Sequence, residues 1–162
     1  MVAMVMLLMI PLTGCGKPMV AQDGDVVKVT YTGTLEDGTV FDTTAGSDPF
    51  VFTLGANQTI KGFEDAVLGM KVGEYKEVTI PPEDAYGQPT DKLHFVVPRS
   101  RLPEGLDPKV GDTLPLNLSN GTTLPVRVLA VNSDNITIDA NSELAGKTLI
   151  FKIELVDIQR NQ

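Results

Sequence analysis

The sequence predicts an α+β fold, in which a curved antiparallel β-sheet packs on one short helix. Alternation of apolar and polar residues, the signature of a half-buried strand, recurs along the chain. Only one window shows the spacing of three or four residues that is typical of an amphipathic helix. The 15 glycines and 11 prolines are spread along the chain and favour many short strands joined by turns. One helix against an antiparallel sheet defines the α+β class.

The first strand-like segment begins after Asp25, in "DVVKVTYTGTLEDGTVFD". Its apolar face carries Val27, Val29 and Tyr31. Asp37-Gly38 predicts a two-residue hairpin turn of type I′, which needs positive φ at both positions. The alternation returns in three later segments, "PFVFTLG", "EYKEVTIPP" and "KTLIFKIELVDI".

The helical window is "TIKGFEDAVLGMKVG", residues 59–73. Its apolar residues share one face: Ile60, Phe63, Val67 and Met70. Glu64 and Asp65 suit the positive end of the helix dipole, and Lys71 and Gly73 predict where the helix ends.

The composition excludes several classes of function. A net charge of −8 argues against nucleic acid as a partner, because phosphate backbones require a basic patch. A single Cys and a single His cannot build a zinc cluster or a disulfide within the chain. We therefore expect neither a metal nor another cofactor.

The chain begins with an uncharged apolar run, "MVAMVMLLMIPL", that is too short to span a bilayer and is typical of the core of a signal peptide. The run is followed by "TGC", so that residues 12–15 resemble the lipobox of bacterial lipoproteins. This pattern predicts a lipoprotein signal peptide over residues 1–14, a lipidated Cys15 and a tether over residues 15–23. No Lys or Arg precedes the run, and a chance cysteine in a Met-rich N-terminus is the alternative.

Four segments together resemble the FKBP-type peptidyl-prolyl cis/trans isomerases. They are "VTYTGTLEDGTVFDTT", "PFVFTLGANQTIKGFEDAVLGMKVGE", "VTIPPEDAYG" and "LIFKIELVDI", and they cover most of residues 26–87 and 147–158. The resemblance implies an apolar pocket that rotates X–Pro bonds, with catalytic residues Tyr31, Phe41, Asp42, Ile60, Phe63, Tyr86 and Phe151. Phe50 and Thr59 would join Ile60 and Tyr86 in binding substrate.

The resemblance also implies individual roles. The Ile60 N–H and the Tyr86 hydroxyl would donate hydrogen bonds to substrate carbonyls, and Asp42 would orient Tyr31. Phe63 stands where many relatives have Trp. The alternatives are that the phenylalanines are ordinary core, that Asp42 caps the following turn, and that Tyr86 only packs.

About fifty residues separate Tyr86-Gly87 from the last strand, which is the size of a small domain. They contain their own hairpin signal, Asn120-Gly121, and resemble the insert-in-flap domain of the SlyD-like branch. The expected domains are residues 24–87 with 140–162 and, between them, the insert, residues 88–139. The branch's His- and Cys-rich tail has no counterpart before Gln162, so we expect no metal binding.

The insert would bind unfolded clients through residues such as Phe95 and Val97, by adding them as a strand to an open sheet edge. Pro115 and Pro125 interrupt strand-like runs and predict edges or bulges. Alternatively, these prolines only protect the edge against aggregation. His94 is expected to be a strand residue rather than a ligand or a base.

The sequence thus predicts a monomeric isomerase that assists the folding of exported proteins, anchored through Cys15 on the periplasmic or cell-surface side of a membrane. Its partners would be unfolded or proline-containing polypeptides. The alternatives are a chaperone or binding lipoprotein that keeps the fold without catalysis, and a cytoplasmic isomerase whose N-terminus is not a signal.

Overall fold

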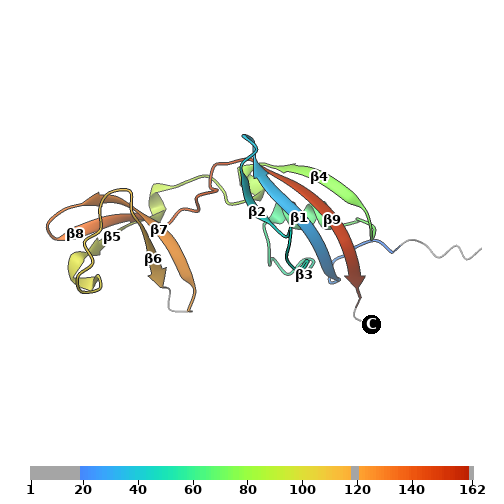
Figure 1. Ribbon diagram of the computed structural model, residues 1–162, viewed down its shortest axis with the longest axis horizontal. Coiled ribbons are helices and arrows are strands. Elements are labelled where there is room, and N and C mark those ends of the chain that lie inside the picture. The colour runs from blue at the N-terminus through green and yellow to red at the C-terminus, as the bar shows by residue number, and fades with distance from the viewer. Residues whose placement is uncertain (1–18, 118–120, 161–162) are drawn as a thin grey trace, which may run out of the picture.

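The computed structural model describes residues 19–117 and 121–160, and Figure 1 shows two bodies joined by two linking segments. The larger domain contains β1 (Val26–Leu35), β2 (Val40–Thr43), β3 (Phe50–Thr53), α1 (Lys61–Val67), β4 (Tyr75–Ile80), the 3₁₀ turn η1 (Pro82–Asp84) and β9 (Leu149–Gln159). The insert contains η2 (Asp91–Leu93), β5 (His94–Pro98), η3 (Arg99–Arg101), β6 (Thr113–Asn117), β7 (Thr123–Val131) and β8 (Asn135–Asp139).

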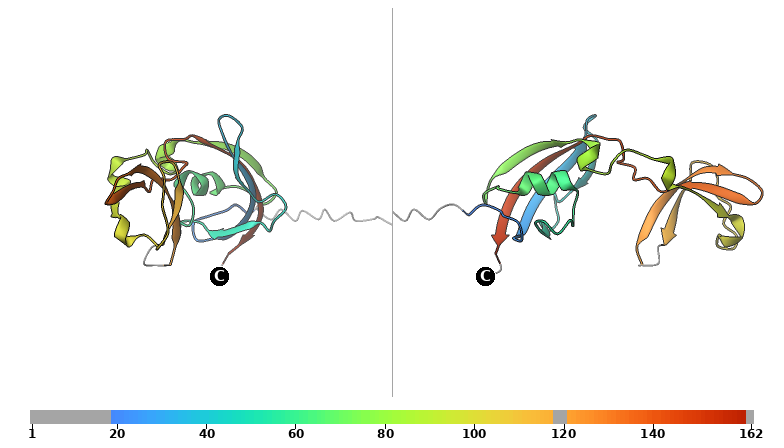
Figure 2. Two further views of the ribbon diagram at one scale, coloured as in Figure 1. Left: turned by 60° about the vertical axis from the view of Figure 1, so that its left-hand side comes forward. Right: turned by 180° about the vertical axis from the view of Figure 1, so that it is seen from behind.

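The sheet of the larger domain is antiparallel and has the order β2-β1-β9-β4, with β3 also paired to β1. The first half of β1 pairs with β3, and its second half pairs with β2. The sheet curves around α1, as Figure 2 shows from two sides. The helix buries Phe63, Ala66 and Val67 against the sheet, so the α+β prediction is confirmed.

The helix is shorter than its sequence window, and the predicted end at Lys71 and Gly73 is wrong. Helical residues stop at Val67, and Gly69 takes a positive φ of 80°. The chain then pairs with the N-terminal segment, because Met70 C=O accepts from Ala21 N–H at 2.8 Å and Gly69 N–H donates to Ala21 C=O at 2.8 Å. The helix therefore ends at Val67 because the following residues pair with residues 20–21, a contact that the spacing of apolar residues does not predict.

The same pairing changes the predicted tether over residues 15–23. Ala21 is 1% exposed and belongs to the core of the larger domain, and Val20 forms an antiparallel bridge with Lys71. The chain is therefore part of the folded domain from Val20 onward, and only residues before it are left for a tether.

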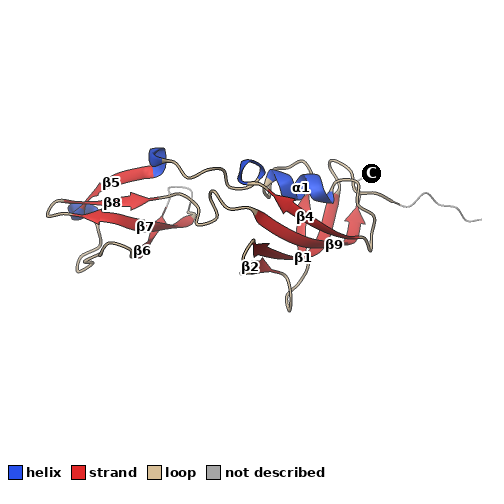
Figure 3. Ribbon diagram, turned by 90° about the horizontal axis from the view of Figure 1, so that it is seen from above, coloured by secondary structure: helices blue, strands red, loops and turns tan. Residues whose placement is uncertain are grey.

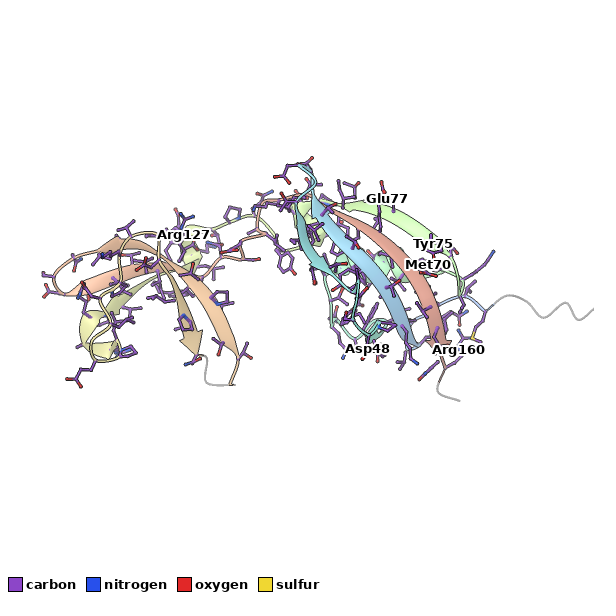
Figure 4. The ribbon with its side chains drawn as sticks, in the orientation of Figure 1. Asp48, Met70, Tyr75, Glu77, Arg127 and Arg160 are labelled. Carbon is purple, nitrogen blue, oxygen red and sulfur yellow. The ribbon has the colours of Figure 1, made fainter. Side chains whose placement is uncertain are left out.

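An ion pair between a half-exposed arginine and a buried aspartate joins the two ends of the larger domain. Arg160, at the end of β9, donates to both carboxylate oxygens of Asp25 at 2.7 and 2.6 Å. The same guanidinium donates to Val20 C=O at 3.1 Å, and Asp25 is only 2% exposed. Figure 4 labels Arg160 at the end of the domain that lies away from the insert.

The hairpin at Asp37-Gly38 forms, but its predicted type is wrong. Gly38 has φ 84°, whereas the only non-glycine with positive φ in the described residues is Asn57, so Asp37 is not left-handed. Leu35 accepts from Gly38 and donates to Thr39, which makes a longer loop ending in a left-handed glycine. The Asp37 carboxylate accepts the Thr39 N–H at 2.9 Å and stabilises that loop instead.

The insert is an antiparallel sheet of its own, with the order β5-β8-β7-β6. Its core consists of Val126, Val128, Ile136 and Ile138. Pro115 lies on the edge strand β6 and faces Pro125 of β7. β8 pairs with β7 only from Arg127 onward, so Pro125 lies beyond that ladder, as its missing N–H requires.

Two segments connect the domains side by side, as Figure 3 shows from above. Gly146 N–H donates to Gly87 C=O at 2.7 Å. The Asn141 carboxamide then accepts from Thr90 N–H at 2.9 Å and donates to Thr90 C=O at 3.1 Å. Asn141 thus substitutes for a backbone strand partner between the two connecting segments, residues 87–90 and 141–146, which together form the neck between the domains.

The described residues contain no helix that is both long and apolar enough to cross a membrane. The predicted signal peptide, Cys15 and Asn120 of the second hairpin signal lie outside the described residues.

Candidate functional site

A pocket of about 260 Å³ opens in the larger domain where the sheet meets the segment leading into α1. Its lining residues are Tyr31, Phe41, Asp42, Phe50, Gln58, Thr59, Ile60, Phe63, Tyr86 and Phe151. The structure therefore brings together every residue predicted for the larger domain's site. Phe95 and Val97, which were also predicted to bind substrate, lie on β5 of the insert and take no part in this pocket.

Aromatic rings in edge-to-face contact form the walls. Phe63, 3% exposed, has its ring centre 5.3 Å from that of Tyr31 and 5.1 Å from that of Phe151. Phe41 meets Phe151 at 5.5 Å with an interplanar angle of 86°. A Cβ at Gly33 would lie 2.6 Å from the Phe41 ring, so only glycine lets this wall form. Such contacts hold the rings in place and keep the pocket apolar.

The Tyr31 hydroxyl donates to the Asp42 carboxylate at 2.6 Å. Burial, followed by this hydrogen bond, raises the pKa of Tyr31 well above its usual range. The phenol therefore stays protonated and its proton is committed to Asp42. The alternative role for Asp42, capping the next turn, is taken by Thr43, whose hydroxyl accepts the Ala45 N–H at 3.1 Å.

Glu64, in the first turn of α1, shapes the loop that carries Thr59 and Ile60. Its two carboxylate oxygens accept the N–H groups of Gly55 at 3.0 Å and Gln58 at 3.1 Å. The Gln58 side chain in turn accepts the Thr53 N–H at 2.8 Å. The loop is thus tied to both α1 and β3. Ile60 N–H makes no hydrogen bond to the described residues and lies in the pocket wall.

Tyr86 follows the 3₁₀ turn η1, where Gly87 takes φ 71° and donates its N–H to Pro82 C=O at 2.7 Å. Its side chain is 48% exposed at the pocket, and its hydroxyl has no hydrogen-bond partner among the described residues. Tyr75, which Figure 4 labels on β4, is 75% exposed and not part of this pocket. Of the three tyrosines, Tyr86 alone combines a place in the pocket with an uncommitted hydroxyl.

Sequence reasoning missed Gln58 as a lining residue. It directly precedes Thr59 and Ile60, so the signal was present in the motif itself. No group of three or more His, Cys, Asp or Glu side chains in the described part of the chain could hold a metal.

The profile of the FKBP-type peptidyl-prolyl cis-trans isomerase family matches residues 17–156. The chain belongs to this family. It is 40% identical over 134 residues to the FKBP-type isomerase SlyD of Aeromonas hydrophila, with 83% of this chain and 62% of that protein covered. It is 38% identical over 151 residues to the short-type peptidyl-prolyl isomerase of Methanocaldococcus jannaschii, covering 84% and 92% respectively.

Among solved structures, FkpA from Escherichia coli is similar at 25% identity with a TM-score of 0.49, covering 89% of this chain and 44% of that one. The relatives from Aeromonas hydrophila and Methanocaldococcus jannaschii are named peptidyl-prolyl isomerases, and the enzyme class of this FKBP-type protein is peptidyl-prolyl cis/trans isomerase. The resemblance stated from the sequence to the FKBP-type family and its SlyD-like members is confirmed.

Proposed function

We propose that this FKBP-type isomerase assists the folding of exported proteins, by rotating X–Pro bonds in the aromatic pocket while the insert holds the unfolded client. The observation that carries the proposal is the pocket itself. Rings in edge-to-face contact from β1, β2, β9 and α1 surround a space that the Tyr86 hydroxyl and the Ile60 N–H border, and neither group has a hydrogen-bond partner among the described residues.

The chemistry requires no nucleophile and no proton transfer. The barrier to X–Pro rotation, about 18–20 kcal/mol, arises from amide resonance, which is lost in the twisted state. Water stabilises the planar, more dipolar amide better than the twisted one, so an apolar pocket favours the transition state relative to solvent. The rings of Phe63, Phe151 and Tyr31 would enclose the proline.

The hydrogen-bonding roles follow from which groups are already engaged. Tyr31 donates to Asp42, so it acts as a fixed wall and not as a donor to substrate. Ile60 N–H and the Tyr86 hydroxyl have no partner in the described chain. In this proposal they bind the carbonyls that flank the proline, and they hold the substrate while its amide turns.

The insert would hold clients at the free edge of β5. The insert's other edge strand, β6, carries Pro115, which has no N–H to donate to an added strand. β5 has no proline before its last residue, and Phe95 and Val96 on it are 46% and 67% exposed. An extended client could pair with this edge and lay apolar side chains along it. Protection of a sheet edge by proline therefore applies to β6, and client binding is proposed for the edge at β5.

Export and anchoring rest on residues 1–15 and belong to this proposal. In Figure 1 the described chain enters the larger domain at the end opposite the neck. A lipid on Cys15 would then hold the protein by the end far from the insert, which leaves β5 free to meet clients.

The test of catalysis uses the chain from Gly16 to Gln162, which keeps Val20 and Ala21 in their places. We expect it to accelerate the cis-to-trans relaxation of a short Xaa-Pro peptide well above the uncatalysed rate. A rate equal to background would leave only the alternative of a binding protein with this fold.

The test of anchoring is the intact mass of the protein taken from membranes of the producing cell. A mass that begins at a lipid-modified Cys15 supports export. A full-length chain from Met1 in the soluble fraction would favour the cytoplasmic isomerase instead.

A further inference from the structure

Strand β1 has a gap in its pairing at the position of Tyr31. On one side it pairs continuously with β9, where Tyr31 faces Ile153. On the other side β3 pairs with β1 only as far as Val29, and β2 pairs with it only from Thr32. Residues 30–31 therefore have no strand partner on that side, although the Tyr31 ring belongs to the pocket.

Thr44, the residue after β2, fills this gap. Its hydroxyl accepts the Tyr31 N–H at 2.8 Å, and its own N–H donates to the Tyr31 C=O at 3.0 Å. The side chain is buried, with 9% exposed. Ser47 in turn donates its hydroxyl to the Thr44 C=O at 3.0 Å, so the loop is closed around Thr44.

The segment of residues 42–44 thus holds Tyr31 at both ends. Asp42 accepts the phenol hydroxyl, and Thr44 binds the backbone N–H and C=O of the same residue. Because both contacts come from three consecutive residues, a shift of the Tyr31 backbone would also displace its ring from Asp42. A ring wall that is fixed in advance is what a pocket selective for a twisted amide requires.

We propose that Thr44 is a positioning residue of the isomerase, which acts through Tyr31 by completing the β1 ladder with its hydroxyl. The catalytic part of this inference rests on the proposed function. The clamp on Tyr31, meaning the hydrogen bonds from residues 42–44 to its hydroxyl and backbone, does not depend on that function.

The test compares Thr44→Val with Thr44→Ser. Valine keeps the shape of threonine but leaves the partly buried Tyr31 N–H without the Thr44 hydroxyl as acceptor, and serine retains the hydroxyl. Thr34→Val is the matched control. Thr34 lies on β1, the strand that carries Tyr31, and it does not line the pocket. The substitution removes a hydroxyl that donates to the Ile150 C=O at 3.3 Å.

The first readout is the titration of Tyr31, followed by the ring-carbon NMR signals of selectively labelled tyrosine. Only three tyrosines and no tryptophan are present, so the signals are few. In the unaltered protein, burial and Asp42 keep the pKa of Tyr31 high. Thr44→Val should lower it toward the ordinary value of about 10, whereas Thr44→Ser and Thr34→Val should leave it in place.

The second readout is turnover of an Xaa-Pro peptide, with thermal unfolding measured alongside. We expect Thr44→Val to lower kcat/KM about tenfold, mainly through kcat, and Thr44→Ser to restore most of it. An unchanged Tyr31 titration in Thr44→Val would overturn the clamp. A lowered Tyr31 pKa with unaltered turnover would overturn the positioning role. Absence of turnover in the unaltered protein would contradict the proposed function, while the titration would still report on the clamp.

Discussion

The larger domain and the insert are both antiparallel sheets, but their cores differ in size and kind. Among the described residues, the core of the larger domain has 15 buried members, including Phe52, Phe63 and Phe151, whereas that of the insert has 4, all aliphatic. The first core backs the pocket with interlocked rings. The second leaves Phe95 and Val96 half exposed on an edge strand. One region is thus preorganised for a single geometry, and the other offers apolar surface that many sequences could cover.

Truncation of one core residue in each region is the strongest test of this contrast. Phe63→Ala should cost the larger domain about 3–5 kcal/mol, because Phe63 touches three other rings and leaves a cavity. Ile138→Ala should unfold the insert while the larger domain keeps its stability. Denaturation followed by amide NMR signals of each domain measures both. A single shared transition in both variants would show that the domains fold as one unit.

Removal of the insert tests whether catalysis can be separated from the proposed client binding. Replacing residues 91–140 by a short glycine-rich loop joins Thr90 to Asn141, which are already hydrogen-bonded. Peptide turnover should stay within about twofold, since the pocket is intact. Refolding of a protein limited by proline isomerisation should slow by about 100-fold, since tethering raises affinity by about that factor. Equal losses in both assays would mean that the insert only supports the larger domain.

The ion pair between Asp25 and Arg160 should make the larger domain sensitive to acid. The hydrogen bond from Arg160 lowers the pKa of Asp25 below its usual range. A depressed pKa contributes stability above the unfolded pKa of about 3.9, and that stability is lost as the pH falls through the folded value.

Arg160→Gln should therefore reduce the midpoint of thermal unfolding by several degrees at neutral pH. Because the depressed pKa of Asp25 is lost, the midpoint should also fall less steeply as the pH is lowered. Thermal melts from pH 7 to about 2 measure this effect. Lys152→Gln is a matched control, because Lys152 pairs with Glu77 on the exposed face at 3.6 Å. The same acid profile in Arg160→Gln and the unaltered protein would exclude the ion pair as the cause.

The smallest effect is expected for Tyr86→Phe. Its hydroxyl makes no bond to the described residues, so stability should change by less than about 0.5 kcal/mol. Turnover should fall about 3- to 10-fold, which corresponds to one lost hydrogen bond in the transition state. Tyr75→Phe, outside the pocket, is the control. Unaltered turnover in Tyr86→Phe would leave the ring, not the hydroxyl, as the functional part.

Several features were predictable because they depend on local pattern. The alternation along β1, β3, β4 and β9 predicted the strands, and the spacing of Phe63 and Val67 predicted the helical face. The motif resemblance predicted nearly all pocket residues, since each of its segments places an aromatic residue at a set position. Gln58 was missed although it stands beside Thr59.

Other features depend on contacts between distant parts of the chain. The helix ends at Val67 because residues 69–71 pair with residues 20–21, and no periodicity records that pairing. The turn after Glu36 follows the geometry of its two strands instead of the Asp-Gly dipeptide.

The sequence by itself therefore determined the fold class, the family and the aromatic composition of the pocket, because side-chain type and spacing carry that information. The tertiary structure decided which contacts hold the polar groups of the pocket. The resemblance implied that Asp42 orients Tyr31 and that Tyr86 donates to substrate; the structure shows the hydrogen bond from Tyr31 to Asp42 and, among the described residues, no partner for the Tyr86 hydroxyl. Thr44 gained its role only because β2 and β3 leave a gap beside Tyr31. Hydrogen bonds between residues far apart in the chain make these distinctions, and they exist only once the sheet has formed.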